Sequence, residues 1–197
     1  MSLNLSLYTI SSVLILDNEG KRLFAKYYKP TLPETNNTFS SSQFDTKEKQ
    51  LKFESTLFSK INKINQDILI FENNLICYKQ VNDIIIIFIS PLSENESLVY
   101  STLSNFNEAL LILFDNSIDK LTLLEKYDLL CLCLDEIIDD GIIIEYDPAT
   151  IVSRVTKPHS NQIDVNNLRN IDISEKGLFN ALSFASKKLG ERLQQGL

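Results

Sequence analysis

The segment Ile84–Ile89 has the sequence IIIIFI, and it constrains the fold more than any other part of the chain. A strand with one solvated face alternates apolar and polar residues, whereas this run is apolar at every position. A strand of this kind is covered on both faces. The run is also far shorter than the roughly 20 apolar residues that a membrane-spanning helix needs. The sequence therefore predicts a buried strand in a sheet that lies between two layers of helices.

The rest of the chain supplies the partners of this strand. Periodicity and turn residues predict the other elements. Strands are expected over residues 7–16, 21–28, 68–71, 75–79 and 83–90. Helices are expected over a segment that Asp45 or Thr46 caps and that carries an apolar stripe from Leu51 to Ile64, and over 95–116, 121–140 and 148–155. Gly141 is expected to end the third of these helices, and Asp147-Pro148 to begin the fourth. The order ββαβββαα, with extra C-terminal helices, predicts an α/β (α+β) protein of the longin-like type. In that architecture a five-stranded antiparallel sheet is sandwiched by helices.

Two parts of the chain are expected. Residues 1–156 form the longin-like domain, and residues 157–197 form a linker followed by a C-terminal helical tail. The tail carries an apolar stripe at helical spacing within residues 174–193. A further polar stretch, residues 30–44, is expected to be a surface loop.

The charge and the N-terminal sequence exclude several classes of function. The formal net charge is −7, so the chain is not expected to bind nucleic acid or to adhere strongly to anionic lipid through its overall field. The three cysteines provide no disulfide framework, which favours a reducing cytosol. Neither a signal peptide nor a lipid anchor is expected.

No residue set predicts catalysis, a metal site or a cofactor. Cys131 and Cys133 are two positions apart on a predicted helix, so their thiols diverge and cannot share one metal ion. The carboxylates between Asp135 and Asp147 are expected to form a solvated acidic face. The alternative, an enzyme that uses these carboxylates as general acids or metal ligands, stays open at this point. No glycine-rich phosphate loop occurs.

The two long predicted helices carry more apolar residues than one buried stripe needs. An outward apolar helix face usually binds another protein. The candidate partner-facing residues are Leu103, Phe106, Leu110, Leu113, Leu124 and Tyr127. The alternative is that these helices and the tail bury each other completely.

Several ordered strings resemble the zeta subunits of the COPI vesicle coat (coatomer), which belong to the adaptor complex small-subunit family. They are LYTI at 7–10, LILDNEG at 14–20, RLFAKYY at 22–28, FE at 53–54, YK at 78–79, SENE at 93–96, DEIIDDG at 135–141, EYDP at 145–148 and IVSRV at 151–155. The resemblance covers roughly residues 5–155. The small chains of clathrin adaptor complexes share the fold but are less similar through these strings.

The resemblance implies a function in binding rather than in catalysis. It implies a longin-like structural subunit, without a cofactor, that pairs stably with the gamma subunit of coatomer and joins the rest of the heptamer. It also implies a cytoplasmic protein, peripheral on Golgi membranes and COPI-coated vesicles, where an Arf-family GTPase recruits the coat. The coat would act in Golgi-to-ER retrograde and intra-Golgi transport. The alternative is the small, sigma-type chain of a clathrin adaptor complex.

Overall fold

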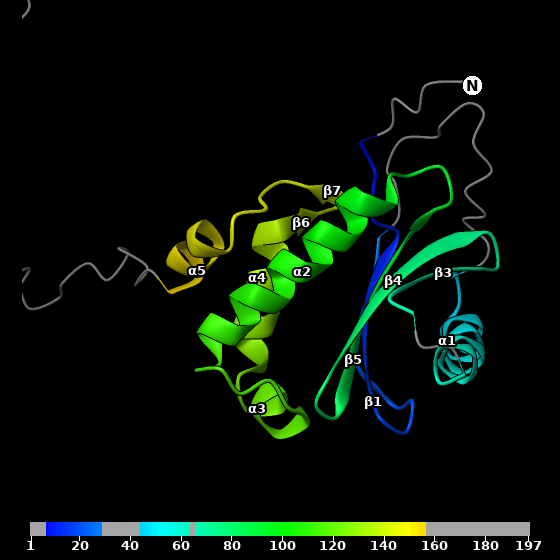
Figure 1. Ribbon diagram of the computed structural model, residues 1–197, viewed down its shortest axis with the longest axis horizontal. Helices are drawn as coiled ribbons and strands as arrows, with labels where there is room; N and C mark the ends of the chain where they lie inside the picture. The colour runs from blue at the N-terminus through cyan, green and yellow to red at the C-terminus, as the bar shows by residue number, and fades with distance from the viewer. Residues whose placement is uncertain (1–6, 29–43, 64–65, 157–197) are drawn as a thin grey trace, which may run out of the picture. The chain divides into compact units, whose positions relative to one another are not determined.

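Five antiparallel strands form the central sheet, in the order β2-β1-β5-β4-β3. Figure 1 shows α1 on one side of this sheet and α2 on the other. This computed structural model describes residues 7–28, 44–63 and 66–156. The strands are β1 (Ser12–Asp17), β2 (Arg22–Tyr27), β3 (Ile68–Phe71), β4 (Asn74–Val81) and β5 (Ile84–Pro91). The helices are α1 (Lys47–Ile61), α2 (Glu96–Leu113), α3 (Lys120–Glu125), α4 (Tyr127–Ile137) and α5 (Pro148–Thr156). A separate two-stranded hairpin contains β6 (Ile138–Asp139) and β7 (Ile142–Ile143).

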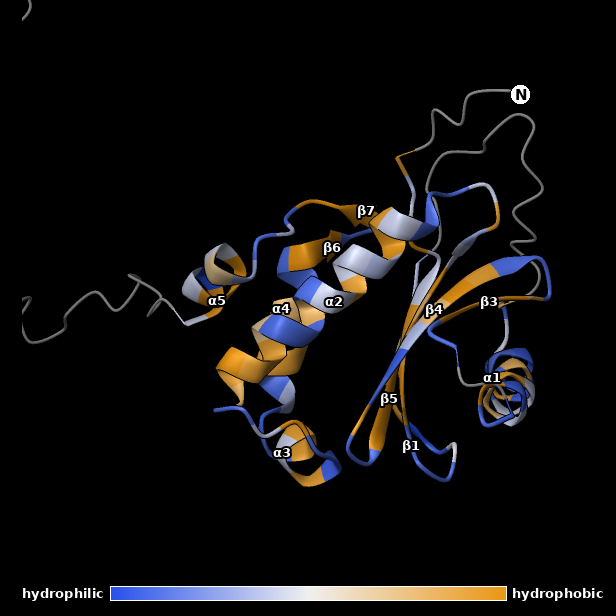
Figure 2. Cartoon of the chain, viewed as in Figure 1, coloured by the Kyte–Doolittle hydropathy of each residue, from blue (hydrophilic) through white to orange (hydrophobic). Residues whose placement is uncertain are grey.

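Strand β5 occupies the middle of the sheet, between β1 and β4. Its side chains alternate between two separate cores, although all of them are apolar. Ile84, Ile86 and Phe88 belong to the core beneath α2 and α4. Ile85, Ile87 and Ile89 belong to the core beneath α1. The prediction of a strand covered on both faces is confirmed, and the hydrophobic colour along this strand in Figure 2 shows the same feature.

Helix α1 covers one face of the sheet by itself. It begins at Thr46, whose hydroxyl accepts a hydrogen bond from the backbone N–H of Lys49 at 3.4 Å, as a helix N-cap does. Phe53, Leu57 and Ile61 recur along the helix at four-residue intervals and are buried against the sheet. The opposite face of α1 is exposed.

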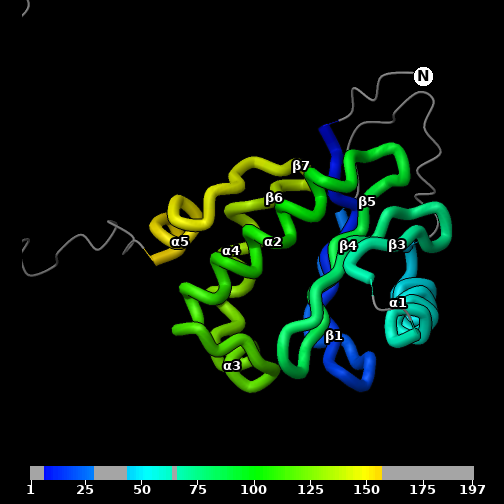
Figure 3. Tube along the Cα trace, viewed as in Figure 1, coloured from blue at the N-terminus to red at the C-terminus, as the bar shows by residue number. Residues whose placement is uncertain are grey.

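The other face of the sheet is covered by α2 and α4, and α5 packs on both of these helices (Figure 3). Asn95 caps α2 by accepting hydrogen bonds from the N–H groups of Ser97 and Leu98. Asp147 caps α5 through the N–H of Thr150 at 2.8 Å, as its position before Pro148 predicts. The fold class predicted from the sequence is confirmed.

The prediction of a single helix over residues 121–140 is wrong. The chain forms two helices, α3 and α4, which are separated at Lys126 where φ is −107° and ψ is 35°. Lys126 Nζ donates to the carbonyl oxygen of Leu113 and to Asp115, and these bonds tie the break to the end of α2. No proline or glycine marks this position, so the sequence pattern contains no signal for the break.

Gly141 does not end a helix. Helix α4 ends at Ile137, and Gly141 lies in the turn of the β6–β7 hairpin with a φ of +85°. Gly141 thus has the positive φ that a helix-ending glycine often adopts, but the element it belongs to is a hairpin turn. The backbone N–H of Ile10 donates to the carbonyl oxygen of Gly141 at 2.9 Å and joins the hairpin to the chain that enters β1.

Some predictions concern residues that the structure does not describe. The loop predicted over 30–44 (all but Phe44), the linker and the tail helix lie outside the described residues, and the division into 1–156 and 157–197 stays a prediction. Among the helices that are described, none is both long and apolar enough to cross a membrane.

Candidate partner-binding surface

Helix α3 and the start of α4 expose three large apolar side chains in succession. Leu121 is 68% exposed, Leu124 is 51% exposed and Tyr127 is 40% exposed. Leu121 and Leu124 are three residues apart in α3, which places them on one side of that helix, and Tyr127 follows directly after the break at Lys126. We call these three residues the α3–α4 face. Apolar groups that share one face and stay in water favour burial against another protein.

The sheet holds α3 at its first residue. Lys120 Nζ donates to Asp17 Oδ2 at 2.8 Å, and the backbone N–H of Lys120 donates to Asp83 Oδ1 at 2.9 Å. Just before the helix, Asn82 Nδ2 donates to the carbonyl oxygen of Ile118 at 2.6 Å. The β1–β2 turn and the β4–β5 turn therefore both fix the entry of α3. This short helix gains its orientation from these bonds rather than from its own length.

Asp17 is the most buried charged group in this anchorage, with 1% of the residue exposed. Burial alone raises the pKa of its carboxyl. The hydrogen bonds from Lys120 and from the backbone N–H groups of Lys21 and Glu19 outweigh burial, so the pKa lies below its ordinary value. The carboxylate is thus charged at neutral pH and holds the lysine in place.

Strand β2 borders the α3–α4 face through Tyr127. The ring of Phe24 lies 6.0 Å from the ring of Tyr127, measured between centroids. Further along α4, Lys26 of the same strand forms a salt bridge with Asp135, and both side chains are substantially exposed. An exposed pair contributes little to stability. The aromatic contact is therefore the firmer link between the edge of the sheet and this face.

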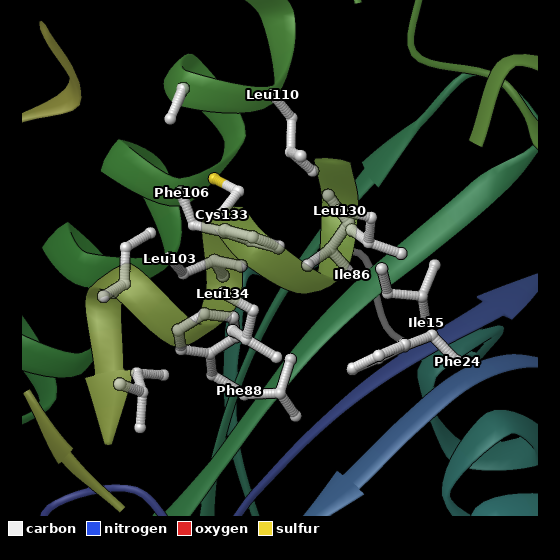
Figure 4. Close-up of a cluster of buried hydrophobic side chains, with 14 of the residues drawn as sticks. Ile15, Phe24, Ile86, Phe88, Leu103, Phe106, Leu110, Leu130, Cys133 and Leu134 are labelled. Atoms are coloured by element: carbon white, nitrogen blue, oxygen red, sulfur yellow. The ribbon is translucent and has the colours of Figure 1, made fainter. Parts of the chain in front are cut away.

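Four of the six residues predicted to face a partner lie inside the chain instead. Leu103, Phe106, Leu110 and Leu113 are buried in the core between α2, α4 and the sheet, and Figure 4 shows the first three among Phe88, Leu130 and Leu134. The prediction is wrong for these four, because α4 and α5 cover the side of α2 that the sheet leaves. Much of the apolar surplus on these helices is therefore buried within the domain itself.

Leu124 and Tyr127 are exposed, and their role as partner contacts stays a proposal. Leu121 was not among the predicted candidates. Its spacing of three residues from Leu124 was the available signal, but the pattern of an unbroken helix hid the position of α3.

The acidic stretch between Asp135 and Asp147 is spread over several structural roles. Glu136 and Glu145 both pair with Arg154 of α5, and Asp147 caps that helix. Hydrogen bonds from the N–H groups of Tyr146 and Asp147 lower the pKa of Glu145. Within the described ranges, no group of three or more potential ligands could hold a metal ion.

Two of the three cysteine thiols are buried in the core. Cys77 and Cys133 are buried, and burial raises the pKa of each thiol to about 12. Thiols with such pKa values are not ionised at neutral pH, and the thiolate is the nucleophilic and metal-binding form.

Comparison with known proteins identifies the family. Residues 9–162 match the family model described as clathrin adaptor complex small chain. The coatomer subunit zeta of Saccharomyces cerevisiae is 41% identical over 194 residues, which cover 98% of this chain and 99% of the yeast protein. The chain belongs to the adaptor small-chain family, among the coatomer zeta subunits.

Other zeta subunits are similar over most of this zeta-family chain. The human coatomer subunit zeta-1 is 35% identical over 150 residues, which cover 76% of this chain and 78% of the human protein. The Arabidopsis thaliana coatomer subunit zeta-2 is 31% identical over 188 residues, covering 93% of this chain and 94% of that protein.

The fold is also that of an adaptor chain. A chain from a structure titled as a homology model of the full-length AP-3 complex in a stretched open conformation superposes with a TM-score of 0.55 at 22% identity. The match covers 74% of this zeta-family chain and 90% of that chain. The longin-like fold is therefore shared with it.

Proposed function

We propose that this chain is a non-catalytic subunit of the COPI coat that pairs with the gamma subunit of coatomer through the α3–α4 face. The observation that carries the proposal is the similarity to coatomer zeta subunits along almost the whole chain, at 41% identity to the yeast protein. In this role the chain joins the rest of the coatomer heptamer on Golgi membranes. An Arf-family GTPase recruits that coat for Golgi-to-ER retrograde and intra-Golgi transport.

The mechanism is burial of apolar surface. Leu121, Leu124 and Tyr127 supply aliphatic and aromatic anchors, the type of side chain that dominates protein interfaces. Removal of apolar area from water contributes about 25 cal/mol per Å², less the cost of association. A stable pair needs about 800 Å² from each partner. The three anchors therefore form the centre of a larger contact.

The anchorage of α3 supports this role. Because Asp17 and Asp83 accept hydrogen bonds at the helix entry and Asn82 donates one, the anchors are oriented before the partner arrives. Preorganised side chains lose less conformational entropy on binding. The large coat subunit thus meets a formed surface.

The test is co-expression of the gamma subunit with the full chain and with the double variant Leu121→Asp/Leu124→Asp. Charged groups at an apolar contact cannot be desolvated cheaply, so we expect the affinity of the pair to fall at least about 100-fold. Size-exclusion chromatography with light scattering reports the stoichiometric pair, and titration calorimetry reports its affinity.

The matched control is Ile70→Asp/Ile112→Asp, since these isoleucines of β3 and α2 are 64% and 50% exposed. We expect this control to pair as the wild type does. Equal loss of affinity for the gamma subunit in both variants would show that the contact is not centred on the α3–α4 face. A wild-type chain that forms no pair with the gamma subunit would overturn the proposal itself.

The sigma-type chain of a clathrin adaptor is the second candidate, because the matching family model carries that description. The same wild-type chain is co-expressed with the large subunits of clathrin adaptors. A stoichiometric pair with one of them, and none with gamma, would decide for the sigma-type function.

A further inference from the structure

Charge is segregated between the two helical layers of the domain. Residues 96–156, which contain α2 to α5, hold twelve Asp or Glu and three Lys or Arg. Residues 47–63, which contain α1, hold five Lys and two Glu. The layer of α1 is therefore basic in a chain whose formal net charge is −7. Pairing through the α3–α4 face does not use this basic layer.

Three of these lysines, Lys49, Lys52 and Lys60, follow one side of α1, and Lys63 comes just after the helix C-cap. All four are exposed. At 100° per residue the three helical positions fall within an arc of about 80°. We call these four residues the lysine stripe. At 1.5 Å per residue its helical part extends about 17 Å along α1. Among the described residues, no salt bridge involves Lys52, Lys60 or Lys63.

The orientation of the lysine stripe is fixed by the opposite side of α1. Glu54, which is 3% exposed, accepts hydrogen bonds from the guanidinium of Arg22 and from the hydroxyl of Tyr27, both on β2. Together with Phe53, Leu57 and Ile61, these bonds prevent the helix from rotating on the sheet. The stripe therefore points away from the domain, and Figure 2 shows hydrophilic residues along α1.

We propose that the lysine stripe of α1 is a contact for a membrane surface that carries anionic phospholipids. The charge of the stripe is complementary to such headgroups. Protein interfaces have apolar, often aromatic centres from which Lys is depleted. The middle of this stripe instead holds Thr56 and Ser59. A lipid surface requires no apolar centre, because juxtamembrane lysines bind it through the surface potential alone.

The acidic layer does not cancel this attraction. It lies across the sheet from α1, at least two packing layers of about 10 Å away, whereas the Debye length is about 8 Å at physiological salt. The stripe therefore acts locally, while the acidic layer is repelled and faces away from the membrane. Each lysine near the surface raises the partition coefficient about fivefold. Four lysines give weak binding that becomes effective when other subunits hold the chain at the membrane.

The test uses the full chain and vesicles of phosphatidylcholine with and without phosphatidylserine at low salt. For the variant Lys52→Gln/Lys60→Gln, the partition coefficient on the anionic vesicles is expected to fall about 25-fold, fivefold per lysine. Flotation or sedimentation of the vesicles measures it. Binding to pure phosphatidylcholine vesicles is expected to be absent for all variants.

The matched control is Lys47→Gln/Lys79→Gln, which changes the net charge by the same amount. Lys47 lies about 140° around α1 from both Lys52 and Lys60, and Lys79 of β4 is outside the helix. We expect the partition coefficient of this control on anionic vesicles to fall by less than about threefold, since charges away from the contact act only through a screened field. Equal losses in the two variants would overturn the stripe as the contact.

Tryptophan reporters test which side of the domain faces the membrane. The chain contains no Trp, so Thr56→Trp in the stripe and Ile112→Trp on α2 each provide a single probe. Quenching by brominated anionic lipid is expected for the first and not for the second. Failure of the wild type to bind anionic vesicles at low salt would overturn the proposal, whether or not the α3–α4 face binds gamma. If gamma pairing were in addition lost in Lys52→Gln/Lys60→Gln, the stripe would be assigned to an acidic protein surface instead.

Discussion

Asp17 connects three parts of the domain through one carboxylate. It ends β1, accepts backbone hydrogen bonds from Glu19 and Lys21 in the turn, and binds Lys120 at the start of α3. A carboxylate with this many donors is stabilised in its charged form. The proposed partner surface thus depends on a residue that does not belong to it.

We expect Asp17→Asn to lower the free energy of unfolding by about 2 kcal/mol at pH 7, because a charge-assisted bond and part of the turn are lost. The pKa of Asp17 is lowered from 3.8 on folding. A lowered pKa contributes stability that is fully present above the unfolded value and is lost as the pH falls through the folded one. The difference between variant and wild type should therefore shrink below pH 3.8.

Urea denaturation from pH 7 to pH 2.5 measures both effects. Asp128→Asn, at an exposed position of α4, removes the same charge and should leave the unfolding free energy unchanged. A difference for Asp17→Asn that stays constant down to the lowest pH would contradict the assigned charge state.

At the scale of elements, the β6–β7 hairpin depends on Gly141. Its φ of +85° is one that L residues rarely adopt, and an added Cβ would lie 2.6 Å from the backbone oxygen of Ile10. Backbone atoms cannot rotate away as a side chain does. We expect Gly141→Ala to lower the free energy of unfolding by about 2 kcal/mol or more.

Thermal or urea unfolding tests this expectation, with Asp139→Asn in the same hairpin as the control. Asp139 is exposed at the end of β6, so the control should stay within about 0.5 kcal/mol of the wild-type unfolding free energy. A Gly141→Ala variant as stable as the wild type would mean that the turn relaxes and that the hairpin is not held by Ile10.

Local sequence signals predicted some elements well and others not at all. The apolar run of β5, a cap at Asp45 or Thr46 and the Asp147-Pro148 start each concern neighbouring residues, so the sequence alone was enough; the structure selects Thr46 as the cap. The break at Lys126 is tied to Leu113 and Asp115, which are 13 and 11 residues earlier in the chain and beyond the reach of a helical pattern. Such tertiary contacts override a helical pattern without leaving a trace in it.

At the scale of the whole molecule, the partner residues were misassigned because a local sequence pattern does not contain the tertiary contacts. Periodicity shows that Phe106 and Leu124 are both apolar positions on helices, but it does not show which helix covers which. The structure buries Phe106 completely between α2, α4 and the sheet, whereas Leu124 is half exposed on a helix held at its N-terminal end. An apolar surplus in a helical pattern therefore does not show by itself which side chains stay exposed for a partner.

This division between core and surface leads to a prediction about the free and the paired chain. Substitutions on the surface usually change stability by less than about 0.5 kcal/mol. We therefore expect Leu121→Asp/Leu124→Asp to unfold alone at nearly the wild-type temperature, because neither side chain belongs to the core. The wild type should in addition gain about 2.7 kcal/mol when the gamma subunit is present at 100 times its Kd, and the variant should gain no more than about 0.4 kcal/mol at the same concentration. Differential scanning calorimetry with and without the partner separates the stability of the free chain from the stabilisation by pairing.

A variant that is already unstable alone would mean that α3 is part of the folding core, and the loss of pairing would then be a consequence of unfolding. A variant that is stable alone and unresponsive to the partner would place the coupling in the α3–α4 face itself.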